Sequence, residues 1–263
     1  MPELPEVETI VSGLRESSLR RKIKKIKVTC PVIVNPPGGL AALTGDSFTG
    51  FDRQGKYIKI TTQKGLRLVV HLRMTGQLFL AKNYQPDKHV HIVIEFAGGA
   101  DTLYYRDIRK FGRWIIVPPR RDFADYIHAG TDALAIQQEE LARLLKKHGA
   151  KALKVFLLDQ TILAGVGNIY ADEIAFSLKI DPHTPAGRIP PQKLLRAVQA
   201  VLKLGIKNKG TSVSDYITST GARGNFQNLL NVYKQQNCRR CGAAIQKVKL
   251  AGRTTHICPR CQS

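Results

Sequence analysis

Apolar and polar residues alternate in short runs through the first half of the chain. The alternation is clear over residues 24–28, 57–60, 66–72, 90–96, 103–105 and 114–117. Clusters rich in glycine, proline or asparagine separate several of these runs, for example at residues 35–39 and 97–101. A period of two places successive side chains on opposite faces of a strand, and several short strands between regular turns are typical of an antiparallel sandwich or barrel. We therefore predict an antiparallel sandwich or barrel over residues 20–117.

A helix is predicted ahead of these strands. Val7, Ile10, Val11 and Leu14 recur at the spacing that places side chains on one face of a helix. Pro5 suits the first turn of that helix, where a missing N–H removes no hydrogen bond.

The second half of the chain has helical spacing instead. Helices are predicted around residues 141–145, at 155–159, at 169–178 and after residue 190. Residues 130–132 indicate a linker, and residues 210–225, rich in Gly, Ser and Thr, indicate a loop. We therefore expect the chain to divide in two at this linker.

The charge balance points to a polyanionic partner. The 263 residues include 41 Lys and Arg against 20 Asp and Glu, which gives a net charge of +21, and such a basic chain favours binding to nucleic acid. With 43% hydrophobic residues the chain is too apolar for a disordered basic tail. No apolar run is long enough to span a membrane, and the acidic, proline-containing start does not resemble a secretory signal. A cytoplasmic protein is expected.

Four of the five cysteines form two C-x-x-C pairs, Cys238 with Cys241 and Cys258 with Cys261. Each pair suits a tight turn that directs two thiolates at one ion, and two such turns complete a tetrahedral zinc site. Two disulfides or four free thiols are the alternatives, and both fit a reducing cytosol poorly. One structural Zn²⁺ ion is therefore expected, with no coordination position left open for catalysis. Cys30 stands alone and is expected to be a small buried apolar residue.

The residue that follows Met1 offers a candidate nucleophile. Removal of the initiator methionine would leave Pro2 with a secondary amine, which can attack an electrophilic carbon to form an iminium ion. Glu3 would lie beside it as an acid or base. The alternative is that Pro2 and Glu3 only begin the first helix.

Motifs along the whole chain occur in the same order as in one enzyme family. They include PELPEVET at residues 2–9, GKY at 55–57, HLRMTG at 71–76, KHVH at 88–91, DIRKFG at 107–112, GVGNIYADE at 165–173, residues 211–212, 215–216, 221–227 and 232–233, and the four-cysteine hairpin. Together they resemble the bacterial formamidopyrimidine-DNA glycosylases.

The resemblance implies a bifunctional base-excision-repair enzyme. Such an enzyme excises oxidised purines, mainly 8-oxoguanine and formamidopyrimidines, from duplex DNA and then nicks the strand by β,δ-elimination. The implied fold is α+β, with three domains. They are an N-terminal β-sandwich with flanking helices at residues 2–130, a helix–two-turn–helix domain at 131–236 and a C-terminal zinc hairpin at 237–263. The implied partner is DNA with oxidised purines or abasic sites, bound by a monomer in the cytoplasm at the nucleoid.

The resemblance also assigns catalytic roles. Pro2 matches the nucleophile that attacks C1′, and Glu3 matches the general acid/base. Lys56 matches the proton donor in β-elimination, and Arg253 matches the residue of the δ step, although alone it would be a solvated hairpin arginine. Glu6 matches a residue near the active site, and a helix-start charge is an equal alternative.

Further matches concern binding of the DNA. A flipped base leaves a gap, and Met74, Arg109 and Phe111 match the side chains that fill it, although Met74 and Phe111 alone would more often be core residues. The matched phosphate contacts are Lys56, His89, Arg109, Lys151, Lys154, Asn168, Tyr233 and Arg253. Lys151 is the weakest of these matches, and on its own it would be a solvated helix lysine. His71 and His91 are expected to be structural.

The loop over residues 211–226 matches the segment that closes over the lesion. Thr211, Ser212 and Tyr216 are its candidate residues. Two departures from the family pattern stand out: Gln54 where arginine is common, and Thr220 where an acidic residue is common. The first would weaken one phosphate contact, and the second would alter lesion preference.

Two alternatives remain at this point. The endonuclease VIII family prefers oxidised pyrimidines and shares the Pro2-Glu3 start and the zinc hairpin. A non-enzymatic basic zinc-ribbon protein would explain the charge and the cysteines, but not Pro2 and Glu3 together with Lys56.

Overall fold

A computed structural model describes residues 1–99, 101–212 and 215–262. The chain divides into two compact units. Unit 1 comprises Met1–His128 and Asn208–Asn225, and unit 2 comprises Ala129–Lys207 and Phe226–Ser263. The segment 208–225 therefore belongs to unit 1, although in the sequence it stands between two stretches of unit 2.

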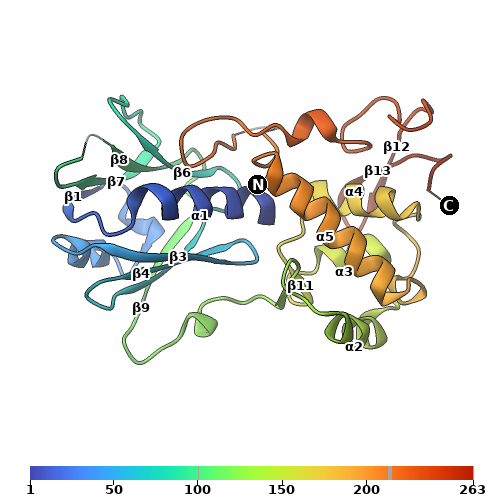
Figure 1. Cartoon of the computed structure of the whole chain (residues 1–263), viewed down its shortest axis with the longest axis horizontal. Coiled ribbons are helices and arrows are strands. Elements are labelled where there is room, and N and C mark those ends of the chain that lie inside the picture. The colour runs from blue at the N-terminus through green and yellow to red at the C-terminus, as the bar shows by residue number, and fades with distance from the viewer. Residues whose placement is uncertain (100, 213–214, 263) are drawn as a thin grey trace. The chain divides into compact units, whose positions relative to one another are not determined.

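Unit 1 contains two sheets, as the alternating pattern predicted (Figure 1). One has the strand order β1-β7-β8-β6 and the other β2-β9-β5-β4-β3. All pairings are antiparallel except that of β2 with β9. The strands are β1 (Ile23–Val28), β2 (Val34–Asn35), β3 (Phe48–Gln54), β4 (Tyr57–Thr62), β5 (Arg67–His71), β6 (Gly76–Ala81), β7 (Val90–Phe96), β8 (Thr102–Asp107) and β9 (Arg113–Val117). Short 3₁₀ helices lie at η1 (Pro31–Ile33), η2 (Gly39–Leu43) and η3 (Phe123–Asp125).

Helix α1 (Leu4–Ser18) packs against strands of both sheets, including β3, β4 and β6 (Figure 1). The four residues predicted to share one face, Val7, Ile10, Val11 and Leu14, are all fully buried. They join strand side chains and Cys30 in one apolar core. Burial of that face stabilises the helix more than its intrinsic propensity does, and it fixes the start of the chain.

Residues 208–225 lie against α1 and β6. The amide of Leu80 in β6 donates to the carbonyl of Ser219 at 2.7 Å, which extends the edge of the sheet by one hydrogen bond. On α1, a Cβ atom at Gly13 would lie 1.9 Å from Ser219 Oγ. The absence of a side chain at Gly13 therefore allows the segment to approach the helix.

Unit 2 is helical, with short strands. Its elements are β10 (Thr131–Asp132), α2 (Gln138–His148), α3 (Leu153–Leu158), β11 (Leu163–Ala164), α4 (Asn168–Leu178), η4 (Ala186–Arg188), α5 (Pro191–Lys207), η5 (Phe226–Leu229), β12 (Gln246–Leu250) and β13 (Arg253–Ile257). The expected helices are present. The segment expected to be a linker forms strand β10, which pairs with β11 in parallel. Within the described residues, every helix is too short or too polar to cross a membrane.

Gly13→Ala should lower the free energy of unfolding by about 1–3 kcal/mol, because the added methyl group overlaps Ser219 in a packed region. Helix propensity alone predicts the opposite, a gain of about 1 kcal/mol. Urea unfolding distinguishes the two outcomes. The double variant Gly13→Ala/Ser219→Gly should recover the loss, and a stabilised single variant would contradict the packing described here.

Candidate active site and nucleic-acid interface

The N-terminus is held by the carboxylate of Glu6. Pro2 and Glu3 are buried at the start of α1. The main-chain N–H of Glu3 donates to Glu6 Oε2 at 2.8 Å, and the N–H of Thr211 donates to Glu6 Oε1 at 2.7 Å. Glu6 is therefore more than a helix-start charge: it joins the candidate nucleophile segment to the candidate lesion loop.

Lys56 lies in the tight turn between β3 and β4, and only 5% of it is exposed. Gly55 before it has φ 57°, a left-handed conformation that glycine adopts without strain. Arg53 holds this turn: its Nε donates to Glu8 Oε2 at 2.7 Å, and its Nη1 donates to the Gly55 carbonyl at 3.1 Å. An ion pair thus connects α1 to the turn that carries Lys56. Sequence reasoning missed Arg53, whose only signal was its place two residues before Gly55.

The ring of His71 lies near this turn. It packs edge-on against Tyr57, with the ring centroids 4.6 Å apart, and its Nδ1 accepts a hydrogen bond from the N–H of Arg73 at 3.0 Å. Desolvation, with the charges of Arg73 and Lys56, lowers the pKa of His71 to about 3. The ring is therefore neutral at physiological pH, as expected of a structural histidine.

Met74, Arg109 and Phe111 lie together on the surface of unit 1. Arg109 Nη1 is 3.0 Å from Met74 Sδ, and the guanidinium carbon is 4.4 Å from the centre of the Phe111 ring. Met74 is 43% exposed and Phe111 46%, so neither is a core residue. We name these three side chains the wedge.

His89, on the neighbouring segment, is partly buried, and its carbonyl accepts the N–H of Asp107 at 2.9 Å.

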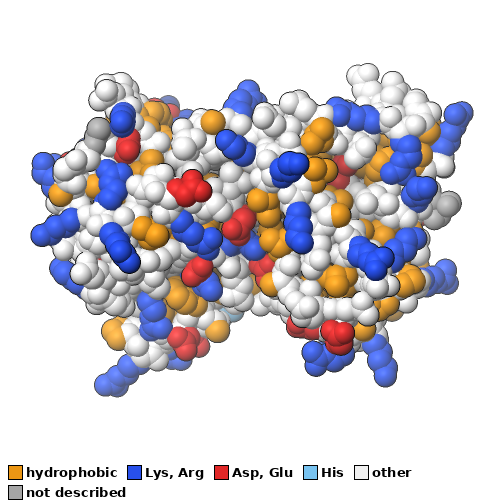
Figure 2. Space-filling model, in the orientation of Figure 1, with side chains coloured by type: hydrophobic (Ala, Val, Ile, Leu, Met, Phe, Trp, Pro, Cys, Tyr) orange, Lys and Arg blue, Asp and Glu red, His pale blue; other side chains and the backbone are white. Residues whose placement is uncertain are grey.

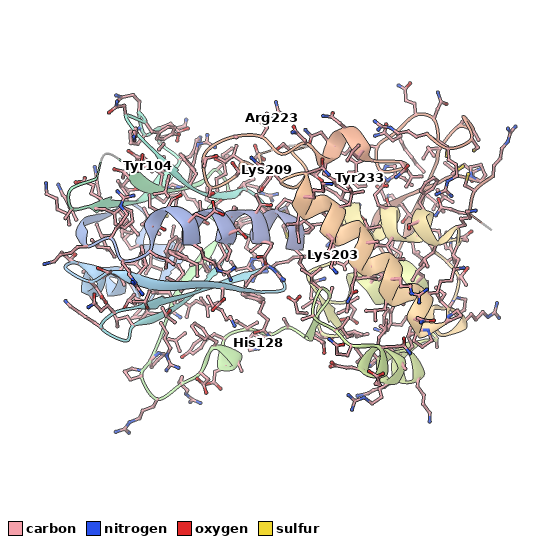
Figure 3. All side chains as sticks on the ribbon, viewed as in Figure 1. Tyr104, His128, Lys203, Lys209, Arg223 and Tyr233 are labelled. Atoms are coloured by element: carbon pink, nitrogen blue, oxygen red, sulfur yellow. The ribbon has the colours of Figure 1, made fainter. Side chains whose placement is uncertain are left out.

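The candidate lesion-loop residues are buried and bonded within unit 1. Ser212 Oγ donates to the Tyr216 carbonyl and accepts the N–H of Gly224, both at 2.9 Å. Arg223, labelled in Figure 3, donates to the Ser212 carbonyl at 3.2 Å. Burial and the charge of Glu6 raise the pKa of Tyr216 well above its usual range, so its hydroxyl remains a donor.

In unit 2, Lys154 lies inside the protein. Its side chain is fully buried, and Nζ donates to Asp172 Oδ1 at 2.6 Å and to the Thr254 carbonyl at 3.0 Å. The second carboxylate oxygen of Asp172 accepts the N–H of His256 at 3.1 Å and lies 2.8 Å from its Nδ1. Lys154 thus links α3, α4 and β13, the strand that Arg253 begins, and its phosphate contact stays a prediction.

The remaining candidates surround this buried group. Asn168, the first residue of α4, donates from Nδ2 to the Thr254 carbonyl at 3.2 Å. The ring of Tyr233, which is labelled in Figure 3, packs against His256 with the centroids 4.9 Å apart. Arg253 is exposed. Lys151 lies in the connection between α2 and α3 rather than on a helix, and it pairs with Asp159 at 2.9 Å.

Glu173, next to Asp172 on α4, holds the segment that carries Tyr233. Its carboxylate accepts the main-chain N–H groups of Asn231, Val232 and Tyr233 at 2.9–3.0 Å. Sequence reasoning assigned neither acidic residue a role. The signal was two adjacent acids in a helix whose other residues are mostly apolar.

The four cysteine sulfur atoms of the hairpin lie within 4.8 Å of one another. The pairs Cys241–Cys258 and Cys238–Cys261 are 3.4 and 3.9 Å apart. Tetrahedral zinc with Zn–S bonds of about 2.3 Å separates its sulfur ligands by about 3.8 Å, so the cluster fits one Zn²⁺ ion. Four thiolates fill the coordination sphere, and the ion would hold the β12–β13 hairpin.

Figure 2 shows Lys and Arg side chains on the surface of each unit. They outnumber acidic residues 41 to 20 in the whole chain. This excess of positive charge suits a polyanionic partner such as nucleic acid.

Removal of zinc should unfold the hairpin, because structural zinc sites contribute on the order of 10 kcal/mol to folding. We expect a mercurial reagent to release one zinc ion per chain, detected with a metal-sensitive dye, and DNA affinity to fall. The far-ultraviolet signal of the sheets should persist. Loss of the sheets together with the metal would contradict the division into two units.

Lowering the pH below about 6.5 should reduce the free energy of unfolding through His71. The unfolded ring binds a proton near pH 6.5, whereas the folded ring has its pKa lowered to about 3. Between these values the unfolded state binds more protons, so stability falls as pH falls. Chemical unfolding at several pH values should show that the free energy of unfolding depends less steeply on pH in His71→Gln than in the parent protein. Equal pH dependence in the two proteins would contradict the neutral ring.

Three family models match this chain. They are the formamidopyrimidine-DNA glycosylase N-terminal domain over residues 1–114, the H2TH domain of the same enzymes over residues 129–216, and the zinc finger found in FPG and IleRS over residues 236–263.

Individual relatives agree. The chain is 38% identical over 275 residues to the formamidopyrimidine-DNA glycosylase of Latilactobacillus sakei, covering 100% of this chain and 98% of that protein. The relative from Desulfitobacterium hafniense is also 38% identical, with 100% of both chains covered.

Solved structures of Lactococcus lactis Fpg have the same fold. Its complex with DNA containing N7-benzyl-Fapy-dG has a TM-score of 0.88 at 36% identity, and its complex with DNA containing an abasic site has a TM-score of 0.88 at 35% identity. Each alignment covers 99% of both chains. On this evidence the chain belongs to the formamidopyrimidine-DNA glycosylase family.

Proposed function

We propose that this protein is a base-excision-repair enzyme that removes oxidised purines from duplex DNA and then nicks the strand. The observation that carries the proposal is the buried start of α1, where Glu6 holds the Pro2-Glu3 segment and Glu8, through Arg53, holds the turn of Lys56. The relatives' name and the lesion-containing DNA in the related structures support the same reaction class.

The first step is attack by the Pro2 nitrogen on C1′ of the damaged nucleotide, once Met1 has been removed. The N–C1′ bond forms as the bond from C1′ to the base breaks, and the base leaves with a proton. Glu3 acts as the acid/base for this transfer and for opening of the sugar ring. Opening of the ring breaks the bond from C1′ to O4′, and O4′ takes up a proton as the Pro2 nitrogen loses one. Because proline is a secondary amine, the product is an iminium ion that keeps its positive charge.

That charge draws electrons from the sugar and drives elimination. Loss of a proton from C2′ breaks the bond from C3′ to its oxygen, and the 3′ phosphate leaves. Loss of a second proton, from C4′, breaks the bond from C5′ to its oxygen, and water then releases Pro2. Lys56 is the proposed proton donor of the first elimination. Arg253 is proposed to act in the second elimination and to bind phosphate.

DNA binding requires the lesion to leave the base stack, which costs a few kcal/mol. The wedge would occupy the gap: Met74 and Phe111 supply apolar surface, and Arg109 supplies donors for the unpaired base. Thr211, Ser212 and Tyr216 would cover the extruded base. The proposed phosphate contacts are Lys56, His89, Arg109, Lys151, Asn168, Tyr233 and Arg253.

The three segments expected from the sequence would divide this work. Residues 2–130 would carry the chemistry, 131–236 would bind the DNA backbone, and 237–263 would hold Arg253 on its zinc hairpin. A monomer is sufficient for all three. The substrate places the protein in the bacterial cytoplasm, at the nucleoid.

Borohydride trapping on a duplex with 8-oxoguanine opposite cytosine tests the proposal. A covalent adduct that maps to Pro2 is expected, because borohydride reduces the iminium ion to a stable amine. Pro2→Gly should lose most of the strand nicking and keep lesion binding, and Glu3→Gln should slow base excision about 100-fold.

Other outcomes separate the alternatives. An adduct only on a thymine-glycol duplex would indicate the pyrimidine specificity of endonuclease VIII. No adduct on either duplex, with Met1 retained in the intact mass, would indicate a DNA-binding protein without this chemistry.

A further inference from the structure

We propose that Asp107 is the positioning residue that holds the two wedge-bearing loops in register. One loop, residues 72–76, carries Met74, and the other, residues 108–112, carries Arg109 and Phe111. Asp107 is fully buried at the end of β8, between them. This inference rests on the proposed function, because it concerns how the wedge is kept ready for the gap left by an extruded base.

The carboxylate of Asp107 accepts donors from both loops. Oδ1 accepts the hydroxyl of Thr75 at 2.5 Å and the N–H of Arg109 at 3.2 Å. Oδ2 accepts the N–H of Gly112 at 2.8 Å and the hydroxyl of Tyr105 at 3.2 Å. An ionised carboxylate offers about four acceptor positions, so these four donors satisfy it.

Thr75 makes the connection between the loops direct. Its hydroxyl donates to Asp107 and accepts the N–H of Arg109 at 3.1 Å. The residue after Met74 is therefore hydrogen-bonded to the residue that carries the wedge guanidinium. A shift of either loop would break a bond to the other.

The surroundings of Asp107 fit this role. Burial and the Asp107 charge raise the pKa of Tyr105 well above its usual range, so the Tyr105 hydroxyl stays a donor. A Cβ atom at Gly112 would lie 1.6 Å from that hydroxyl oxygen, so the loop approaches closely only because residue 112 is glycine. His91 Nε2 lies 2.9 Å from the carbonyl oxygen of Asp107, and this contact fixes the main chain at Asp107.

The wedge needs such support because its own side chains are exposed. Met74 and Phe111 are nearly half exposed, and exposed apolar side chains gain little from burial. Arg109 joins them through contacts that solvent can reach. A displacement of about 1 Å can cost two orders of magnitude in rate, so a fixed backbone is required for the three tips to enter one gap together.

Asp107→Asn tests the inference. The amide has nearly the same shape as the carboxylate, but its NH2 group is a donor and faces two of the donors that the carboxylate accepts. We expect base excision from duplex 8-oxoguanine DNA to slow at least about tenfold in single-turnover assays. Nicking of single-stranded DNA with a preformed abasic site should stay within about twofold, because that substrate has no opposite base and no gap to fill. Fluorescence of 2-aminopurine next to the lesion should show slower opening of the duplex.

Two controls sharpen the result. Asp122→Asn removes an exposed carboxylate of unit 1 that pairs with Arg67 at 2.9 Å, and it should leave both reactions unchanged. If Asp107→Asn fails to fold, Thr75→Val removes the link between the loops. It should slow excision from duplex DNA alone, and Thr75→Ser, which keeps the hydroxyl, should restore it.

Equal rates for Asp107→Asn and the parent protein on duplex DNA would overturn the inference. So would an equal loss on both substrates, because that would indicate damage to the chemistry rather than to the wedge. Failure of the parent protein to excise the lesion would instead overturn the proposed function, so the two failures are distinguishable.

Discussion

Buried carboxylates that accept main-chain N–H groups hold the functional segments of this protein. Glu6, Asp107, Asp172 and Glu173 are each at most 2% exposed. Each accepts at least one N–H from a segment without regular helical structure or from the zinc hairpin. A buried charge is costly unless hydrogen bonds satisfy it, and here the same bonds fix the loops. Loops have little apolar surface to bury, so this is an effective way to give them one conformation.

The arrangement separates stability from function. The apolar core of α1 and the two sheets stabilises unit 1, and the carboxylates then orient short segments on that support. In unit 2, the ion pair of Lys154 with Asp172 serves the same purpose for β13. Loss of either partner would leave the other as an unpaired buried charge, which is costly. The buried Lys154 is therefore matched by the buried Asp172.

Much of this structure follows from local patterns in the sequence. The period of two predicted the sheets, the spacing of Val7 to Leu14 predicted the buried face of α1, and the C-x-x-C pairs predicted the four-sulfur cluster. Each of these patterns consists of residues within a few positions of one another, although the strands and cysteine pairs then meet over longer distances in the sequence. The attachment of residues 208–225 to α1, the burial of Lys154 and the role of Arg53 were not predicted, because each depends on partners distant in sequence. The resemblance to a family located the candidate site residues, but only the structure shows which groups hold them.

The composition of the wedge has a consequence for the proposed excision of oxidised bases. Met74 is one of only two methionines in the chain, and its exposed thioether lies beside the Arg109 guanidinium. Oxidants convert an exposed thioether to a sulfoxide, which is polar and a stronger acceptor. The sulfoxide oxygen would bind the guanidinium more tightly and would replace an apolar tip with a hydrated one. The conditions that generate the lesions therefore also act on the side chain that enters the gap, and reductive repair of methionine would maintain the wedge.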